Sequence, residues 1–196
     1  MKRALIVMAK APDAKSVKTR LAGALSDGER LALYMKLLDG TISKMRGVSS
    51  ADLYINNSPA GSEDFFGPRY GLPLIAQRGD DIGQRMHNAI ADALAMGYGS
   101  VALVGVDIPG LTASIVERAF DLLDGVDVVF GPAEDGGYYL VAMRAAHAGL
   151  FDDIRWSTAH TLADTLARAK GLGLNVAQVD RLFDIDRPED LRRYQG

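Results

Sequence analysis

The chain has 196 residues, of which 22 are lysine or arginine and 25 are aspartate or glutamate, so its formal net charge is -3. This near balance argues against a general nucleic-acid binder, which typically carries an excess of basic residues. The sequence contains no cysteine, which excludes disulfides, thiolate metal sites and thiol nucleophiles. Apolar residues make up 48% of the chain, enough for a substantial core, and we expect residues 1–196 to form a single domain.

The apolar run at the N-terminus covers residues 4–9 and ends at Lys10. This run is shorter than the core of a signal peptide and much shorter than a membrane span. It predicts a first buried strand instead. We therefore expect a cytoplasmic protein without a membrane span.

Strand-like and helix-like segments alternate along the whole chain, with no linker and no internal repeat. Short apolar runs predict strands at residues 3–8, 51–56, 72–77, 101–105, 127–131, 138–143 and 175–179. Helical periodicity and cap signals predict helices at residues 27–45, 82–96, 113–123 and 158–172, with a short one near the C-terminus. Residues 57–71 are rich in glycine, proline and serine, which predicts a loop. The alternation predicts an α/β fold with a mostly parallel sheet and helices on both faces.

Several of the predicted helices begin at recognisable cap residues. Ser26 and Glu29 have the spacing of a capping box, and Thr112 has the side chain of an N-cap. Asp186 is expected to cap the C-terminal helix, with Glu189 completing a second box.

In α/β folds of this kind, ligands bind at the carboxyl ends of the strands, near the point where the strand order reverses. The glycine-rich phosphate loop and the dinucleotide-binding fingerprint are both absent from the sequence. The unusual polar residues of this chain nevertheless follow predicted strands.

The segment after the first predicted strand, residues 9–20, reads AKAPDAKSVKTR and contains four cations. These cations are Lys10, Lys15, Lys18 and Arg20. A loop at the carboxyl edge of the sheet with this charge is suited to a polyphosphate. The alternative is a solvated basic loop.

Residues 77–86 contain the second polar cluster, QRGDDIGQRM. Asp80 or Asp81 can cap the helix that follows, and Arg85 and Asn88 share one face of that helix. An ordinary capped helix explains this segment as well as a binding site does.

Asp107 comes two residues after the apolar run at residues 101–105, just beyond the end of a predicted buried strand. Burial of an unpaired carboxylate is costly, and an aspartate at this position commonly binds a divalent ion or a ribose. Magnesium prefers oxygen ligands and often bridges one or two carboxylates to substrate phosphates. The alternative is an aspartate in a turn with Pro109.

Two further segments carry carboxylates. Glu134 and Asp135 precede a pair of glycines, where they can orient sugar hydroxyls or act as a base, although a hairpin turn of the Asp-Gly type is an equal alternative. Asp186 lies in the sequence DIDRP at residues 184–188, where it is either a helix cap or a second metal ligand that faces Asp107.

Six ordered blocks give the chain a resemblance that covers nearly its whole length. They are AKAP…VKTRLA at 9–22, QRGDDIGQRM at 77–86, VGVDIPGL at 104–111, GPAEDGGYYLVAM at 131–143, WSTAHTLADTL at 156–166 and FDIDRPEDL at 183–191. On these blocks the chain resembles an uncharacterised bacterial family described as glycosyltransferase-like, within the nucleotide-diphospho-sugar transferase superfamily. Members look like small GT-A domains. The chain is also distantly similar to the small guanylyltransferases that act on molybdenum cofactor and on phospholactate.

The resemblance implies roles for the basic segment and for the second polar cluster. Lys18 and Arg20, with Lys10 of the same segment, would bind the phosphates of an activated nucleotide. Asp80 and Arg85 would lie near its base or ribose. One departure is Lys15, which stands where the family usually has a glycine, and it raises the question of how closely this loop wraps the phosphates.

The resemblance also implies a role for each of the acidic residues. Asp107 would bind the Mg²⁺ or Mn²⁺ ion that bridges the phosphates, and Asp186 is a possible second ligand. Glu134 and Asp135 would face the sugar or the acceptor, so that the catalytic set would be these two residues and Asp107.

The function expected from the resemblance is glycosyl transfer from a nucleotide-diphospho-sugar to a small acceptor, dependent on a divalent metal. The first alternative is nucleotidyl transfer from a nucleoside triphosphate, as in guanylyltransferases. The second alternative is a non-catalytic nucleotide-binding module, because a fold by itself does not establish an activity. The sequence leaves the base, the sugar, the acceptor and the oligomeric state open.

Overall fold

A seven-stranded sheet with the order β3-β2-β1-β4-β6-β5-β7 forms the centre of a computed structural model, which describes residues 1–195. The strands, in chain order, are β1 (Arg3–Lys10), β2 (Ala51–Ser58), β3 (Leu74–Ala76), β4 (Ser100–Val104), β5 (Val128–Pro132), β6 (Tyr138–Met143) and β7 (Val176–Gln178). The helices are η1 (Thr19–Leu21, a 3-10 turn), α1 (Asp27–Met45), α2 (Glu63–Tyr70), α3 (Ile82–Ala95), α4 (Ala113–Leu122), α5 (Thr161–Gly171) and α6 (Pro188–Gln195).

All strands except β6 run in the same direction. Strand β1 pairs in parallel with β2 on one side and with β4 on the other. Strand β6 is antiparallel to both β4 and β5, so the turn at residues 133–137 and the loop after β4 meet at one edge of the sheet. The predicted mostly parallel α/β sheet is confirmed, and the strand order reverses between β1 and β4.

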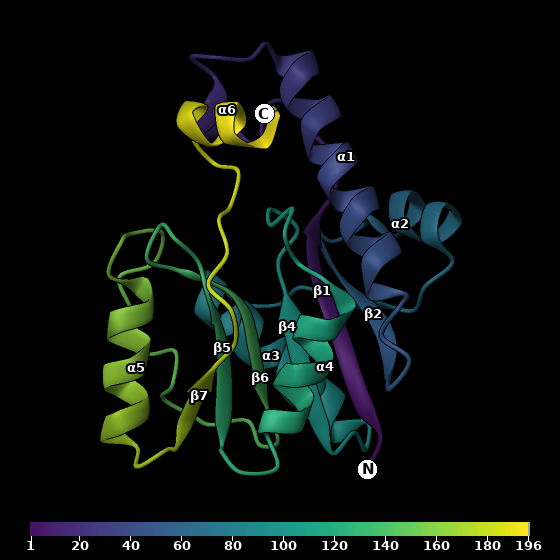
Figure 1. Cartoon of the computed structure of the whole chain (residues 1–196). Coiled ribbons are helices and arrows are strands. Elements are labelled where there is room, and N and C mark those ends of the chain that lie inside the picture. Colours follow the sequence, from purple (N-terminus) through teal and green to yellow (C-terminus); the bar gives the residue numbers. More distant parts are fainter. Residues whose placement is uncertain (196) are drawn as a thin grey trace.

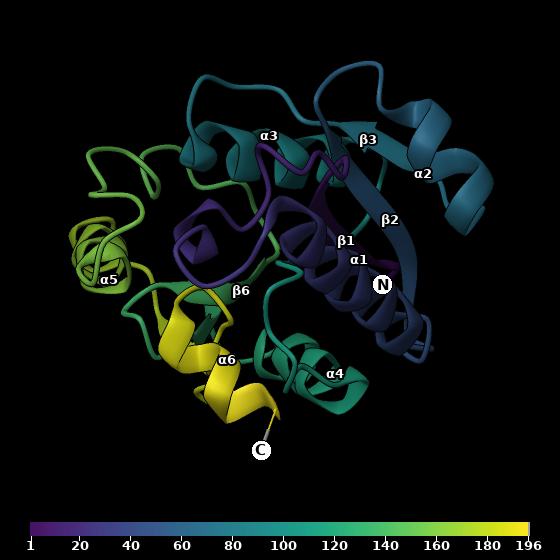
Figure 2. The same ribbon diagram turned by 90° about the horizontal axis from the view of Figure 1, so that it is seen from above.

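Helices cover both faces of the sheet (Figures 1 and 2). On one face α1, α2 and α4 pack against the sheet in one apolar cluster, with Leu38 of α1 and Phe120 of α4 nearly or fully buried. On the other face α3 and α5 form a second cluster around Ile90 and Phe130. The alternation of side chains along each strand divides the core in this way, because successive residues point to opposite faces.

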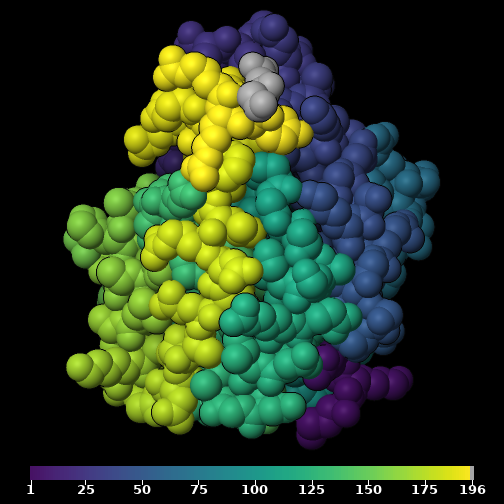
Figure 3. Space-filling view, viewed as in Figure 1, coloured from purple at the N-terminus to yellow at the C-terminus, as the bar shows by residue number. Residues whose placement is uncertain are grey.

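The C-terminal segment returns over the carboxyl edge of the sheet. From β7 the chain runs up one face of the molecule and ends in α6, which lies beside the N-terminal half of α1 (Figures 1 and 3). A third apolar cluster holds this arrangement, in which Ile185 is fully buried against Leu21, Leu37 and Leu191. Lys18 of the basic segment after β1 is buried where the C-terminal segment crosses this edge.

The longest helix, α1, has 19 residues and begins at a capping box. The backbone N–H of Glu29 donates to the Ser26 hydroxyl, and the Glu29 carboxylate accepts from the backbone N–H of Ser26. Thr112 caps α4 as predicted, and Asp81 caps α3. No helix in residues 1–195 is both long and apolar enough to cross a membrane.

The prediction of a loop at residues 57–71 is wrong, because the segment contains helix α2. Its sequence is a poor helix former, with Pro68 inside the helix. Tertiary packing stabilises it instead. Phe66 is fully buried in the core, and the Tyr70 hydroxyl donates to Asp39 of α1 at 2.7 Å. Local sequence signals do not report contacts with a distant helix.

The predicted cap at Asp186 is also wrong. The backbone N–H groups of Asp186 and Arg187 both donate to the carboxylate of Asp190, at 3.1 Å and 2.7 Å. Asp190 therefore satisfies the start of α6, and Glu189 forms no box with Asp186. The carboxylate of Asp186 is left available for other contacts.

Replacement of Ser26 by alanine is expected to lower the free energy of unfolding by about 1 kcal/mol, because the start of α1 loses an acceptor for its backbone N–H groups. The Glu29→Ala variant is expected to be destabilised as well. Since both residues belong to one reciprocal pair, the double variant should lose less than the sum of the two single changes. Urea unfolding of the three variants measures this, and full additivity would contradict the coupling.

Candidate functional site

A cavity of about 420 Å³, which we call the switch-point cavity, opens at the carboxyl edge of the sheet where the strand order reverses between β1 and β4. The ends of β1 and β4, the basic segment and the start of α3 all contribute to its walls. Six residues singled out from the sequence line it, namely Lys10, Lys18, Arg20, Arg85, Asp107 and Asp186. Residues from four distant parts of the sequence are thus brought together, as the switch-point rule for α/β sheets predicts.

Lys18 lies at the centre of the contacts around this cavity. Its side chain is only 3% exposed, and its ammonium group lies 2.6 Å from Asp107 Oδ1 and 3.8 Å from Asp186 Oδ1. The same ammonium donates to the backbone carbonyl of Ile185 at 2.5 Å. Lys18 also has a φ of 49°, in the left-handed region that residues other than glycine rarely adopt. The surrounding contacts hold it in this unfavourable conformation.

Asp107 joins the loop after β4 to the C-terminal segment. Its backbone carbonyl accepts from the N–H of Ile185 at 3.0 Å. Its Oδ1 atom is buried and makes an ion pair with Lys18 but no directed hydrogen bond. The side chain as a whole is 45% exposed, so a carboxylate that is anchored on one side remains accessible from the cavity.

Arg20 and Asp186 form a second ion pair at the mouth of the cavity. The guanidinium donates to Asp186 Oδ2 at 2.5 Å and to the backbone carbonyl of Ser157 at 3.3 Å. Arg20 is 46% exposed, so it can exchange these contacts for a ligand. Together with buried Lys18 it gives this end of the cavity two cations next to two carboxylates.

The same cavity also has walls from β1, the segment after β3 and the start of α3. Met8, Ile82 and Gln77 line it, and Arg85 contributes a guanidinium whose Nε donates to the carbonyl of Gly79 at 3.0 Å. Asp80, predicted to lie near a base or ribose, is exposed and does not line this cavity. Its backbone N–H donates to the side chain of Gln84.

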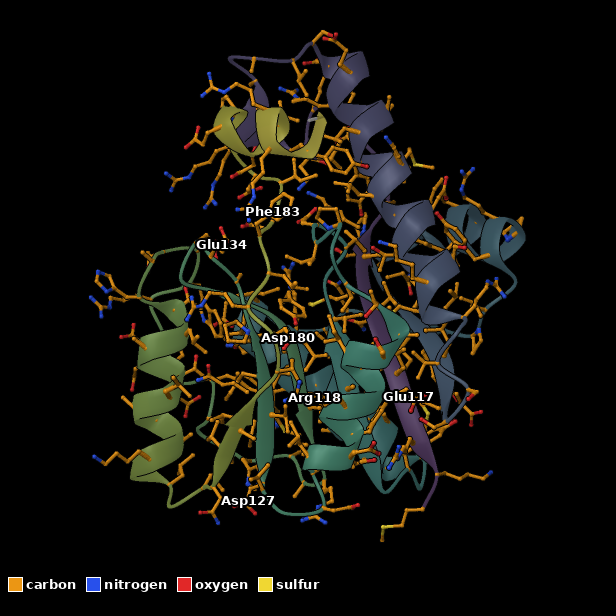
Figure 4. The ribbon with its side chains drawn as sticks, in the orientation of Figure 1. Glu117, Arg118, Asp127, Glu134, Asp180 and Phe183 are labelled. Carbon is orange, nitrogen blue, oxygen red and sulfur yellow. The ribbon has the colours of Figure 1, made fainter. Side chains whose placement is uncertain are left out.

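Glu134 and Asp135 lie on the turn between β5 and β6, beside a neighbouring cavity of about 350 Å³. Arg193 of α6 donates to both oxygens of Glu134, at 2.5 Å and 3.1 Å, and this pairing lowers the pKa of Glu134. The Arg193 guanidinium also lies 4.1 Å from the centre of the Phe183 ring. Figure 4 shows Glu134 on its turn below α6, with Phe183 on the chain that leads up to the helix.

The structure adds Asp184, which the sequence had presented only as a neighbour of Asp186. Asp184 shares a small cavity of about 150 Å³ with Asp107 and Asp135. Burial, together with the nearby carboxylates of Asp135, Asp186 and Asp190, raises the pKa of Asp184 to about 6. The period of two in an extended chain is a signal that could have found this residue, since Asp184 and Asp186 flank the buried Ile185.

These carboxylates suit a hard divalent cation. Within residues 1–195 no three acidic or histidine side chains lie close enough to enclose a metal ion by themselves. Magnesium, however, is commonly held by one or two carboxylates and completes its shell with water and substrate phosphates. Asp107, whose buried Oδ1 has no directed hydrogen bond, and the neighbouring Asp184 and Asp186 fit this pattern.

The chain is similar in sequence to a bacterial family and to a guanylyltransferase. A model of the bacterial family described as "Uncharacterized protein conserved in bacteria (DUF2064)" matches residues 41–158. The 2-phospho-L-lactate guanylyltransferase of Methanopyrus kandleri is 34% identical over 113 residues, which cover 55% of this chain and 56% of that protein. The match therefore spans little more than half the length of this relative.

Comparisons with solved structures cover nearly the whole chain. A protein of Desulfovibrio desulfuricans G20, assigned as a nucleotide-diphospho-sugar transferase, is 31% identical with a TM-score of 0.89 over 95% of this chain and 84% of its own. CMP:2-keto-3-deoxy-manno-octonic acid synthetase in complex with CTP has a TM-score of 0.65 at 12% identity, over 100% and 97% of the two chains. The manganese complex of Rv0371c from Mycobacterium tuberculosis H37Rv has a TM-score of 0.59 at 14% identity, over 98% and 97%. The last two likenesses concern the fold alone.

The raised pKa of Asp184 predicts a pH-dependent stability. An aspartate with the ordinary pKa of 3.8 in the unfolded chain titrates at about 6 in the folded protein, so between these values the folded state keeps a proton that the unfolded state has lost. The free energy of unfolding therefore falls as pH rises through this window. Replacement of Asp184 by asparagine should raise stability by roughly 1 kcal/mol at pH 7, with solvent screening allowed for, and by nothing at pH 3.5.

Thermal unfolding in metal-free buffer across pH 3.5 to 7 measures this difference. The exposed Asp124 at the end of α4 offers the matched control Asp124→Asn, which should not show the pH-dependent gain. An equal effect of the Asp184 substitution at both ends of the range would contradict the raised pKa.

Proposed function

Because the chain belongs to the bacterial DUF2064 family and has the fold of nucleotide-diphospho-sugar transferases, we propose that it is a transferase that uses an activated nucleotide with a divalent metal ion. One observation carries the proposal. A single cavity at the switch point of the sheet combines a buried lysine and an exposed arginine, Lys18 and Arg20, with the carboxylates of Asp107 and Asp186. Cations beside oxygen ligands are what a metal-bound polyphosphate requires.

The phosphates of the nucleotide would lie at Lys18 and Arg20 in this cavity. Lys18 supplies a positive charge in a largely dehydrated position, where its attraction for a phosphate is stronger than in water. Arg20 adds a guanidinium that can bind two phosphate oxygens. Both side chains have their charges paired with aspartates in the free protein, so the binding of phosphate and metal exchanges one set of ion pairs for another.

Asp107 would hold the metal ion, with Asp186, which lines the same cavity, as a second ligand. The ion would neutralise charge on the phosphates as the bond to the leaving group breaks. Lys18 and Arg20 share that task, and the fixed backbone bonds around Ile185 keep all these groups in place before the substrate arrives. Catalysis would consist mainly of positioning and of electrostatic stabilisation.

The acceptor would occupy the neighbouring cavity, which contacts the first through Arg20 and Asp186. Its walls carry Glu134, Asp135 and Asp184. Asp135 and Asp184 have no cation bonded to them among the ion pairs of residues 1–195, whereas Glu134 is paired with Arg193. We therefore assign contacts with acceptor hydroxyls to Asp135 and Asp184 and a structural task to Glu134.

Nucleotidyl transfer is our first candidate for the reaction. In it an acceptor oxygen attacks the α-phosphorus of a nucleoside triphosphate, and pyrophosphate leaves. The similarity to a guanylyltransferase, at 34% identity, supports this candidate. The second candidate is glycosyl transfer, in which the acceptor attacks the sugar carbon of a nucleotide-diphospho-sugar and a nucleoside diphosphate leaves. The likeness to the Desulfovibrio protein supports it.

Replacement of Asp107 by asparagine should abolish the metal-dependent part of nucleotide binding. At 100 times its dissociation constant, a nucleotide with Mg²⁺ should stabilise the wild-type protein by roughly 2.7 kcal/mol. The variant should lose the part of this gain that disappears in the wild type when a chelator is added. Thermal shift with a panel of nucleoside triphosphates and nucleotide-diphospho-sugars measures it. The Asp124→Asn variant is the control, and an undiminished Mg²⁺ effect in the Asp107 variant would exclude Asp107 as a ligand.

The products distinguish the two reactions. We expect pyrophosphate from a nucleoside triphosphate in the presence of Mg²⁺ and a phosphorylated or hydroxylated acceptor. Release of a nucleoside diphosphate from a nucleotide-diphospho-sugar would establish glycosyl transfer instead. Nucleotide binding without either product, across a broad acceptor panel, would indicate a non-catalytic nucleotide-binding module.

A further inference from the structure

The part of the switch-point cavity that Met8, Ile82 and Gln77 line has the character of a nucleobase site, an inference that rests on the proposed function. With the phosphates at Lys18 and Arg20, a base would extend toward Met8, Ile82 and Gln77, which line the same cavity. Ile82 is a large aliphatic side chain that is 37% exposed at the start of α3. It offers an apolar surface for the flat face of a base, while hydrogen bonding must come from the polar residues beside it.

Gln77 is fixed in one orientation. Its side-chain Nε2 donates to the backbone carbonyl of Asn56 at 2.9 Å and to that of Ala9 at 3.3 Å. Both partners are carbonyl oxygens, which only accept, so the amide nitrogen must face them and a flipped amide is excluded. The backbone N–H of Gln77 donates to Asn57 at 2.8 Å, which holds the residue at the edge of the sheet.

The oxygen of the same amide, Oε1, differs from Nε2 in its hydrogen bonding. None of the hydrogen bonds found in residues 1–195 uses Gln77 Oε1 as an acceptor, and Gln77 lines the cavity. Oε1 is thus an acceptor held in place before a ligand binds, which lowers the entropic cost of using it. Arg85, near the start of α3, donates its Nε–H to the Gly79 carbonyl. Its two terminal nitrogens remain as donors for a ligand.

We propose that Gln77 selects the nucleobase, with Oε1 accepting a hydrogen bond from an exocyclic amino group. The site would then bind nucleotides whose base carries an amine, and would disfavour those in which hydrogen or a carbonyl replaces it. A carbonyl at that position would face Oε1 with no proton between the two oxygens, and both would remain without a partner. The Arg85 guanidinium complements the selection, because amino-bearing bases present an unprotonated ring nitrogen next to the amine.

Matched pairs of nucleotides test the proposal on the wild-type protein. Dissociation constants with Mg²⁺ are measured by titration calorimetry for GTP, ATP and ITP and for CTP and UTP. GTP and ITP differ only in the 2-amino group, whereas ATP against ITP and CTP against UTP exchange an amine for a carbonyl. In the tightest-binding pair we expect the amino-bearing nucleotide to bind about tenfold more strongly, as one hydrogen bond allows.

The Gln77→Met variant removes the acceptor while nearly keeping the volume of the side chain. It should weaken binding of the amino-bearing nucleotide to the level of its partner and leave the partner within about twofold of its wild-type affinity. Gln84→Met is the matched control, because Gln84 is an exposed glutamine on the same segment that does not line this cavity. This control should retain the tenfold preference.

Each outcome has a distinct meaning. Equal affinity of the wild-type protein for both members of every pair would overturn the inference and leave the proposed function standing, and so would an unchanged preference in Gln77→Met. Failure of all nucleotides to bind would overturn the proposed function together with the inference. Since the wild-type comparison needs no variant, the test holds even where loss of the Nε2 contacts with Ala9 and Asn56 impairs folding.

Discussion

The arrangement of the site depends on the contacts of the buried ammonium group of Lys18. This group contacts Asp107 on the loop after β4 and the carbonyl of Ile185 on the C-terminal segment, and it lies near Asp186. A charge that is 3% exposed is tolerated only where partners replace the lost water. Lys18 therefore joins three segments that are distant in sequence, and the same demand for partners supports the proposed contact of Lys18 with a phosphate.

The C-terminal segment divides the carboxyl edge of the sheet into two connected cavities. Backbone bonds from Ile185 to Asp107 and from Glu134 to Leu182 fix its path, and the apolar cluster around Ile185 secures it from above. On one side lies the cavity with Lys18 and Arg20, and on the other lies the cavity with Asp135 and Asp184. A donor and an acceptor on either side of this carboxylate-bearing segment would have their reacting groups brought together there.

Much of this could be predicted from local signals. The strands, the capping box of Ser26 and the caps at Asp81 and Thr112 follow from side chains that act within a few residues, which is why their predictions hold. Helix α2 was missed because Phe66 and Tyr70 stabilise it through contacts with the core and with α1. The extent of the domain and the roles assigned to the site residues stay predictions.

The sequence by itself determined the α/β class and the residues that gather at the carboxyl edge of the sheet. It did so because parallel strands all end at the same edge and their polar termini must meet there. Only the tertiary structure decided the pairing of those residues. In the fold, Glu134 is paired with Arg193, and Asp186 forms an ion pair with Arg20 instead of a helix cap. Asp184 lines a small cavity with Asp107 and Asp135. Pairings between charges depend on distances across the fold, and no local pattern in the chain specifies these.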